Sequence, residues 1–69
     1  MFDSEYFAKM LSTTRLYSGL SLREMGSLIG VSAATLQRVE SGKKPDIDTF
    51  MKICKWANWN SIEEFEKVK

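Results

Sequence analysis

Apolar residues recur at helical spacing in five stretches of the chain, and polar residues fill the positions between them. Successive helix residues are about 100 degrees apart, so apolar positions three and four residues apart form one stripe that can be buried. The stripes expected to be buried are Tyr6, Phe7, Met10, Leu11, Thr14 and Tyr17; Leu22, Met25, Gly26 and Ile29; Leu36 and Val39; Ile47, Phe50, Met51, Cys54 and Ala57; and Ile62, Phe65 and Val68. The pattern predicts an all-α fold of five helices, with Trp56 outside the fourth stripe.

Residues that start and stop helices stand between these stripes. Ser21 is a good N-cap, and Glu24 three residues later completes a capping box. Gly30 can take the left-handed conformation that ends a helix, and Ser32 can start the next one. The expected helices are 3 or 4 to 18, 22 to 29, 33 to 40 or 41, a fourth capped by Asp46 or Asp48, and a last one capped by Ser61. The link between the second and third is so short that these helices must cross steeply, which predicts a helix-turn-helix over about residues 21–41.

The third helix has a polar face suited to reading DNA. With Leu36 and Val39 inside, the opposite face carries small and hydrogen-bonding side chains, and those expected to contact bases are Ala33, Ala34, Gln37 and Arg38. Arginine can bond guanine bidentately, glutamine can bond adenine, and an alanine methyl can touch the methyl of thymine. The alternative is that Arg38 is an ordinary solvated residue and that the alanines only favour the helix.

The central segment resembles the Cro/C1-type helix-turn-helix family of phage repressors and bacterial regulators. The matching residues are Leu20, Ser21, Met25, Ile29, Gly30, Val31, Ser32, Thr35, Leu36, Val39, Glu40, Gly42, Lys43 and Pro45. The resemblance implies a compact, five-helix, lambda repressor-like DNA-binding domain over residues 1–69, with the third helix in the major groove. Gly26 stands where the family usually has alanine, at a cost of about 1 kcal/mol of helix stability. Gln37 stands where serine is frequent.

Two further sets of residues are expected to act, one because of its position in the motif and one because of the resemblance. Contacts to DNA phosphates are expected from Ser21, Leu22, Arg23, Ser32, Thr35, Ser41, Lys43 and Lys44. Helix N-termini attract anions, and loops after a recognition helix run close to the backbone, although the lysines could simply solubilise the loop. Family members often pair an arginine of the first helix with the glutamate near the end of the third, so Arg15 and Glu40 are expected to form a structural pair.

Composition limits the remaining chemistry. The chain has 69 residues, no histidine and one cysteine, which excludes an internal disulfide and a cysteine or histidine metal cluster. We expect no enzyme activity, no catalytic residues, no cofactor and no metal. The absence of a long apolar run and of a basic, apolar leader at the N-terminus predicts a cytoplasmic protein without membrane association.

The net charge is low for a DNA-binding protein, at +1. Residues 1–45 carry six basic and four acidic groups, which gives +2, and residues 46–69 carry four basic and five acidic groups, which gives −1. We therefore expect modest affinity from one subunit and dependence on a second copy, so that a homodimer forms at least on DNA. Trp56 and Trp59 are candidates for the dimer contact, because aromatic residues are enriched at interfaces. The alternative for both, and for Phe2, is partial burial at the edge of the core.

These features predict a sequence-specific regulator of transcription that binds double-stranded DNA. The simplest form is a small repressor of phage or mobile-element type that binds an operator as a dimer. One alternative is a controller-type activator or autoregulator. Another is a protein-interaction module, such as an antitoxin or an inhibitor of a larger regulator, that keeps the helix-turn-helix fold and has a protein partner.

Overall fold

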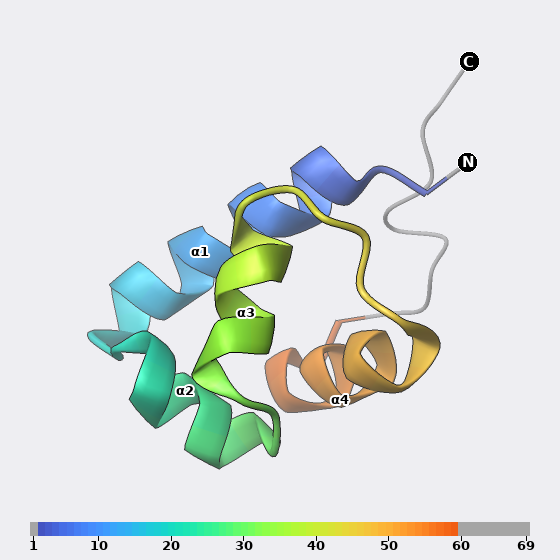
Figure 1. Cartoon of the computed structure of the whole chain (residues 1–69). Helices are drawn as coiled ribbons and strands as arrows, with labels where there is room; N and C mark the ends of the chain where they lie inside the picture. The colour runs from blue at the N-terminus through green and yellow to red at the C-terminus, as the bar shows by residue number, and fades with distance from the viewer. Residues whose placement is uncertain (1, 60–69) are drawn as a thin grey trace.

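A computed structural model describes residues 2–59, and helices account for the regular secondary structure of these residues (Figure 1). Within that range the helices are α1 (Ser4–Ser18), α2 (Leu22–Ile29), α3 (Ala33–Glu40) and α4 (Ile47–Ala57). The all-α prediction and the bounds of the first three helices are confirmed. The fifth helix predicted after Ser61 lies outside the described residues. Across residues 2–59, no helix is long and apolar enough to cross a lipid bilayer.

Each helix begins at a polar residue whose side chain accepts a hydrogen bond from a backbone N–H three residues later. These N-caps are Asp3, Ser21, Ser32 and Asp46, with donor–acceptor distances of 2.8 to 3.1 Å. Such bonds satisfy donors that the helix itself leaves unpaired. Left-handed residues end three of the helices, namely Gly19, Gly30 and Asn58. Local chemistry therefore fixes where the helices start and stop.

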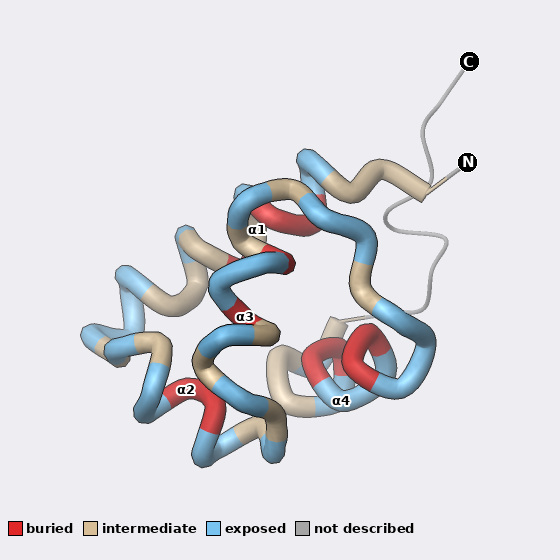
Figure 2. The backbone as a smooth tube through the Cα atoms, viewed as in Figure 1, coloured by how far each residue is buried: buried red, intermediate tan, exposed pale blue. Residues whose placement is uncertain are grey.

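The helix α3 lies at the centre of the arrangement and contacts both α1 and α2 (Figure 1). The helix α4 contacts α2. Their inward faces meet in one apolar core (Figure 2). Its buried members are Phe7, Leu11, Met25, Leu36, Val39, Phe50, Ile53 and Cys54. Because α3 packs against the other helices with one face, its opposite face lies at the surface.

The buried face of α1 is narrower than the predicted stripe. Phe7 and Leu11 are fully buried, but Tyr6 is 45% exposed and Tyr17 is 90% exposed. Burial extends instead to Ala8, which lies on the other side of Phe7 around the helix. The prediction that the two tyrosines are buried was wrong, because the face that meets the core is turned away from them.

The buried face of α4 is also displaced from the predicted one. Ile47 is 70% exposed and Met51 is 61% exposed, whereas Thr49 and Ile53 are buried. The predicted stripe followed apolar residues alone, but the face that meets the core is centred on Ile53. The same rotation brings Trp56, which was expected outside the stripe, to a half-buried position against the core.

Candidate nucleic-acid interface

The turn between α2 and α3 is packed closely against α2. The carbonyl oxygen of Gly26 accepts hydrogen bonds from the backbone N–H groups of Gly30 and Val31, at 2.7 and 3.0 Å. A Cβ atom on Gly26 would lie 2.5 Å from the carbonyl oxygen of Val31, closer than such atoms come in real proteins. An alanine would therefore force the backbone of the turn to move. The expected advantage of alanine at this position does not hold here.

The polar face of α3 lies at the surface, opposite Leu36 and Val39, which are buried. Four of its residues are exposed, namely Ala34, Gln37, Arg38 and Ser41. Ala33, the other predicted base-reading residue, is half-buried at the start of the helix. The hydroxyl of Ser41 donates to the carbonyl oxygen of Arg38 at 2.8 Å, so it is used within the chain.

A groove of about 520 Å³ separates α3 from the start of α4. Its lining residues are Thr35, Arg38, Val39, Lys43, Lys44, Pro45, Asp46 and Thr49. The groove thus brings together a predicted base-reading residue, Arg38, and two predicted phosphate-binding lysines. Three cations and one carboxylate line it, which leaves it positively charged. A polyanion is favoured beside such a surface.

Asp46, one of the two aspartates predicted as the cap of the fourth helix, is the cap in the structure, and it was not predicted as part of this groove. Its carboxylate accepts a hydrogen bond from the backbone N–H of Thr49 at 2.8 Å, and this bond is the main reason why the pKa of Asp46 is lowered. The carboxylate therefore stays ionised beside the lysines. Sequence could identify the cap, but only the path of the loop after α3 brings it next to the groove.

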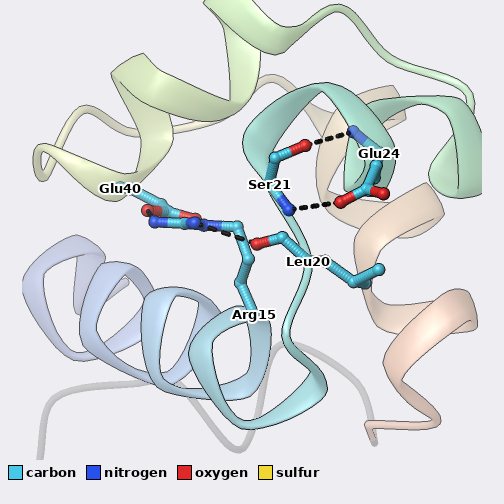
Figure 3. Close-up of polar contacts among 5 residues, drawn as sticks. All are labelled: Arg15, Leu20, Ser21, Glu24 and Glu40. Atoms are coloured by element: carbon cyan, nitrogen blue, oxygen red, sulfur yellow. Dashed lines mark hydrogen bonds and ion pairs between the residues drawn. The ribbon is translucent and has the colours of Figure 1, made fainter.

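The start of α2 carries three more predicted phosphate contacts. Ser21 and Arg23 are exposed, and Leu22 is half-buried against the core. Glu24 accepts from the backbone N–H of Ser21 at 2.9 Å, while the Ser21 hydroxyl accepts from the Glu24 N–H at 3.0 Å (Figure 3). The hydrogen bond from the Ser21 backbone N–H to the Glu24 carboxylate is the main reason why the pKa of Glu24 is lowered, and the Ser21 side chain lowers it further. The Ser21 groups expected to meet phosphate are thus already bonded within the capping box.

At the start of α3, Ser32 and Thr35 are joined in a similar way. The Ser32 oxygen accepts from the backbone N–H of Thr35 at 3.1 Å, and its hydroxyl donates to the Thr35 hydroxyl oxygen at 2.8 Å. Ser32 is exposed and Thr35 half-buried. Because the Thr35 oxygen accepts in this bond, the Thr35 hydroxyl can still donate its own proton to a phosphate oxygen.

Arg15 and Glu40, predicted as a structural pair, are brought together between α1 and the end of α3 (Figure 3). Arg15 Nε donates to Glu40 Oε2 at 2.8 Å and Arg15 Nη2 donates to Glu40 Oε1 at 3.1 Å. A third bond runs from Arg15 Nη1 to the carbonyl oxygen of Leu20 at 3.1 Å. The hydrogen bonds to Glu40 raise the pKa of Arg15, and partial burial opposes them. The guanidinium of Arg15, on α1, thus makes hydrogen bonds both to the link between α1 and α2 and to the C-terminal end of α3.

The aromatic residues whose role was open in the sequence lie against the core. The ring of Phe7 is 5.5 Å from that of Phe2 and 5.6 Å from that of Trp59, measured between centroids. Trp56 is half-buried against the same cluster. These positions agree with burial at the edge of the core, and the dimer contact through Trp56 and Trp59 stays a prediction.

Two short helices joined by a tight glycine turn, the second with an exposed polar face beside a basic groove, define a helix-turn-helix DNA-binding domain. The helix-turn-helix family model matches residues 11–55. The chain belongs to this family, in its Cro/C1-type branch, and is a DNA-binding regulator of transcription. Comparisons with curated proteins and with solved structures gave no match.

Proposed function

We propose that this chain is a cytoplasmic repressor of phage or mobile-element type that binds an operator as a homodimer and blocks a promoter. The whole chain acts as one domain with no enzymatic role. The observation that carries the proposal is the exposed face of α3, where Gln37 and Arg38 stand clear of the core beside the basic groove. A major groove of B-DNA is wide enough to admit such a helix.

In this proposal α3 lies in the major groove, and each of its exposed side chains contacts the base that its chemistry suits. Arg38 bonds guanine and Gln37 bonds adenine, while Ala33 and Ala34 allow the start of the helix to approach thymine methyls. Phosphates are held by the starts of α2 and α3 and by the loop after α3, and these contacts fix the position of the motif without reading sequence. The residues proposed for this are Ser21, Leu22, Arg23, Ser32, Thr35, Ser41, Lys43 and Lys44.

Selection of bound duplexes from a random pool tests this function directly. We expect an enriched motif of two half-sites related by two-fold symmetry and spaced about one helical turn apart. The symmetry of the motif would report the dimer, and its bases would report the reading residues. A pool that remains random at low salt would contradict the proposal.

Replacement of Arg38 separates base reading from simple attraction to DNA. Because a bidentate contact to guanine discriminates by about 1 to 3 kcal/mol, Arg38→Ala should lose that much affinity and relax the preference at one base pair. The matched control is Arg23→Ala, which removes the same charge from an exposed position on α2 and should weaken all sequences alike. Affinities for every single-base variant of the selected site provide the measurement. Identical base preferences in wild type and Arg38→Ala would show that Arg38 does not read a base.

A second candidate function, binding to another protein, is favoured by one surface feature. Leu16 and Tyr17, at the end of α1, are 68% and 90% exposed, and the net charge is only +1. Neighbouring exposed apolar side chains are a surface that a protein partner could cover. Salt-dependent retardation of random duplex DNA favours the repressor, whereas no retardation at low salt together with a stable protein complex favours the second candidate.

A further inference from the structure

The outward face of α4 carries large apolar side chains at the surface. Ile47 and Met51 are 70% and 61% exposed and stand one turn apart, where side chains are neighbours on a helix. Ile47 also lines a hollow of about 310 Å³ together with Phe2, Pro45 and Phe50, and the charged residues Lys44 and Asp46 complete its lining. The apolar surface therefore continues from α4 across the loop that precedes it, which makes it a patch rather than isolated residues.

The charges beside this patch are arranged so that they would complement those of a second copy of the same helix. Asp48 and Lys55 are both exposed, lie seven residues apart, and so fall two turns apart on the same flank of the Ile47–Met51 stripe. The acid is near the start of α4 and the base near its end. When two copies of a helix pair in antiparallel fashion, residues on the same flank face each other from opposite ends. Asp48 would then meet a lysine and Lys55 an aspartate.

We infer that the outward face of α4 is the surface on which two copies of this chain pair, in antiparallel orientation across a two-fold axis near Met51. Met51 packs on its own counterpart, and Asp48 faces the partner subunit's Lys55, with the reciprocal contact on the other side. The ion pair of Asp48 with Lys52, at 3.3 Å, is exposed and weak, so it does not hold Asp48 away from this contact. The inference rests on the dimer of the proposed function and assigns it to α4.

The size of the patch sets the strength of the pairing. A standard stable interface covers about 800 Å² on each partner. The whole chain exposes 4852 Å², so such an interface would need about a sixth of it. One face of an 11-residue helix and its preceding loop provides less than this. The pairing is therefore weak in free solution and becomes effective when two half-sites of DNA hold the copies side by side.

Self-association of the full chain without DNA tests the surface independently of the operator. Sedimentation equilibrium up to about 1 mM, where weak pairing is populated, should show a dimer, and the methyl NMR signals of Ile47 and Met51 should shift with concentration. Met51→Glu should raise the dissociation constant about tenfold or more, as for a residue at the centre of an interface. The matched control is Leu28→Glu, which changes an equally exposed residue on α2, at 60%, and should leave the constant unchanged.

A charge exchange tests the orientation. Asp48→Lys and Lys55→Asp should each weaken pairing several-fold, and the double variant should restore it because the two-fold axis again brings opposite charges together. The inference would be overturned by a monomeric wild type at about 1 mM, by equal effects of Met51→Glu and Leu28→Glu, or by loss of pairing only in Trp56→Ala or Trp59→Ala. A lower melting temperature for Met51→Glu with unchanged pairing would also overturn it, since the face would then be covered within one chain. If the proposed function fails, duplex selection gives no motif while these association measurements still stand.

Discussion

At the scale of single residues, Gly26 determines how closely the turn of the motif approaches α2. Replacing a helical glycine by alanine usually stabilises by about 0.5 to 1 kcal/mol. Here the new Cβ would meet the carbonyl oxygen of Val31 at 2.5 Å, and that oxygen belongs to the backbone. We therefore expect Gly26→Ala to lower the free energy of unfolding by about 1 to 2 kcal/mol, as for overpacking in a core.

Urea unfolding measures this effect, with Ser27→Ala as the control. Ser27 is exposed on the same helix, so its replacement should give the ordinary small gain of a better helix former. A Gly26→Ala chain as stable as the control would show that the turn moves aside at no cost.

The same residue shows what sequence reasoning could and could not supply. The N-caps at Ser21, Ser32 and Asp46 were predictable because each bond spans three residues of one local segment. The contact at Gly26 was not, since it depends on the direction of the Val31 carbonyl, which the path of the whole turn sets. The resemblance indicated a close approach between helices at this position, but not that the Val31 carbonyl leaves no room for a Cβ atom.

Acid should reveal the contribution of the helix caps. Hydrogen bonds lower the pKa values of Glu24 and Asp46, so the ionised forms favour the folded chain. Their stabilisation is complete above the unfolded pKa values, about 4.3 for glutamate and 3.9 for aspartate, and is lost as pH falls through the lower folded values. Glu24→Gln keeps an oxygen acceptor without titrating, so its free energy of unfolding should fall less between pH 5 and pH 3 than that of wild type. Parallel urea-derived curves for the two proteins would contradict this.

At the scale of the helices, the sequence predicted the positions of the helices more accurately than the faces that they bury. For α4 the helix itself was predictable, but Ile47 and Met51 were wrongly assigned to the core in place of Thr49 and Ile53. Hydrophobicity ranks side chains, whereas the direction in which α2 lies decides which side of α4 is covered. Apolar residues left outside by that geometry are the ones that the inferred dimer surface uses.

Arg15 and Glu40 are the polar contact that holds α3 to α1, and their side chains are only 19% and 11% exposed. Arg15→Met should cost about 2 to 3 kcal/mol of unfolding free energy, because it leaves Glu40 partly buried without its partner. The double variant Arg15→Met, Glu40→Met should lose less, since no uncompensated charge remains. Thermal and urea unfolding of both variants measure this. A single variant within 0.5 kcal/mol of wild type would reduce the pair to an ordinary surface contact.

At the scale of the whole molecule, the distribution of charge matters more than its sum. The total is +1, but Arg38, Lys43 and Lys44 converge on one groove beside α3 with a single carboxylate among them. The sequence placed these cations near the motif. It could not show that they share one groove with Asp46, because that depends on how the loop crosses from α3 to α4.

This local concentration of charge should appear in the salt dependence of DNA binding. Each phosphate neutralised contributes about −0.9 to the slope of log affinity against log salt concentration, so removing one contact changes the slope by about one. Lys44→Ala should therefore weaken binding to all duplexes and make the slope per subunit less steep by about one. Lys9→Ala removes the same charge from an exposed position on α1, away from the groove, and should leave the slope unchanged. Titrations of one duplex between 50 and 200 mM salt, the range over which phosphate contacts dominate, supply both slopes. Equal slopes for the two variants would mean that net charge, rather than the groove beside α3, attracts the DNA.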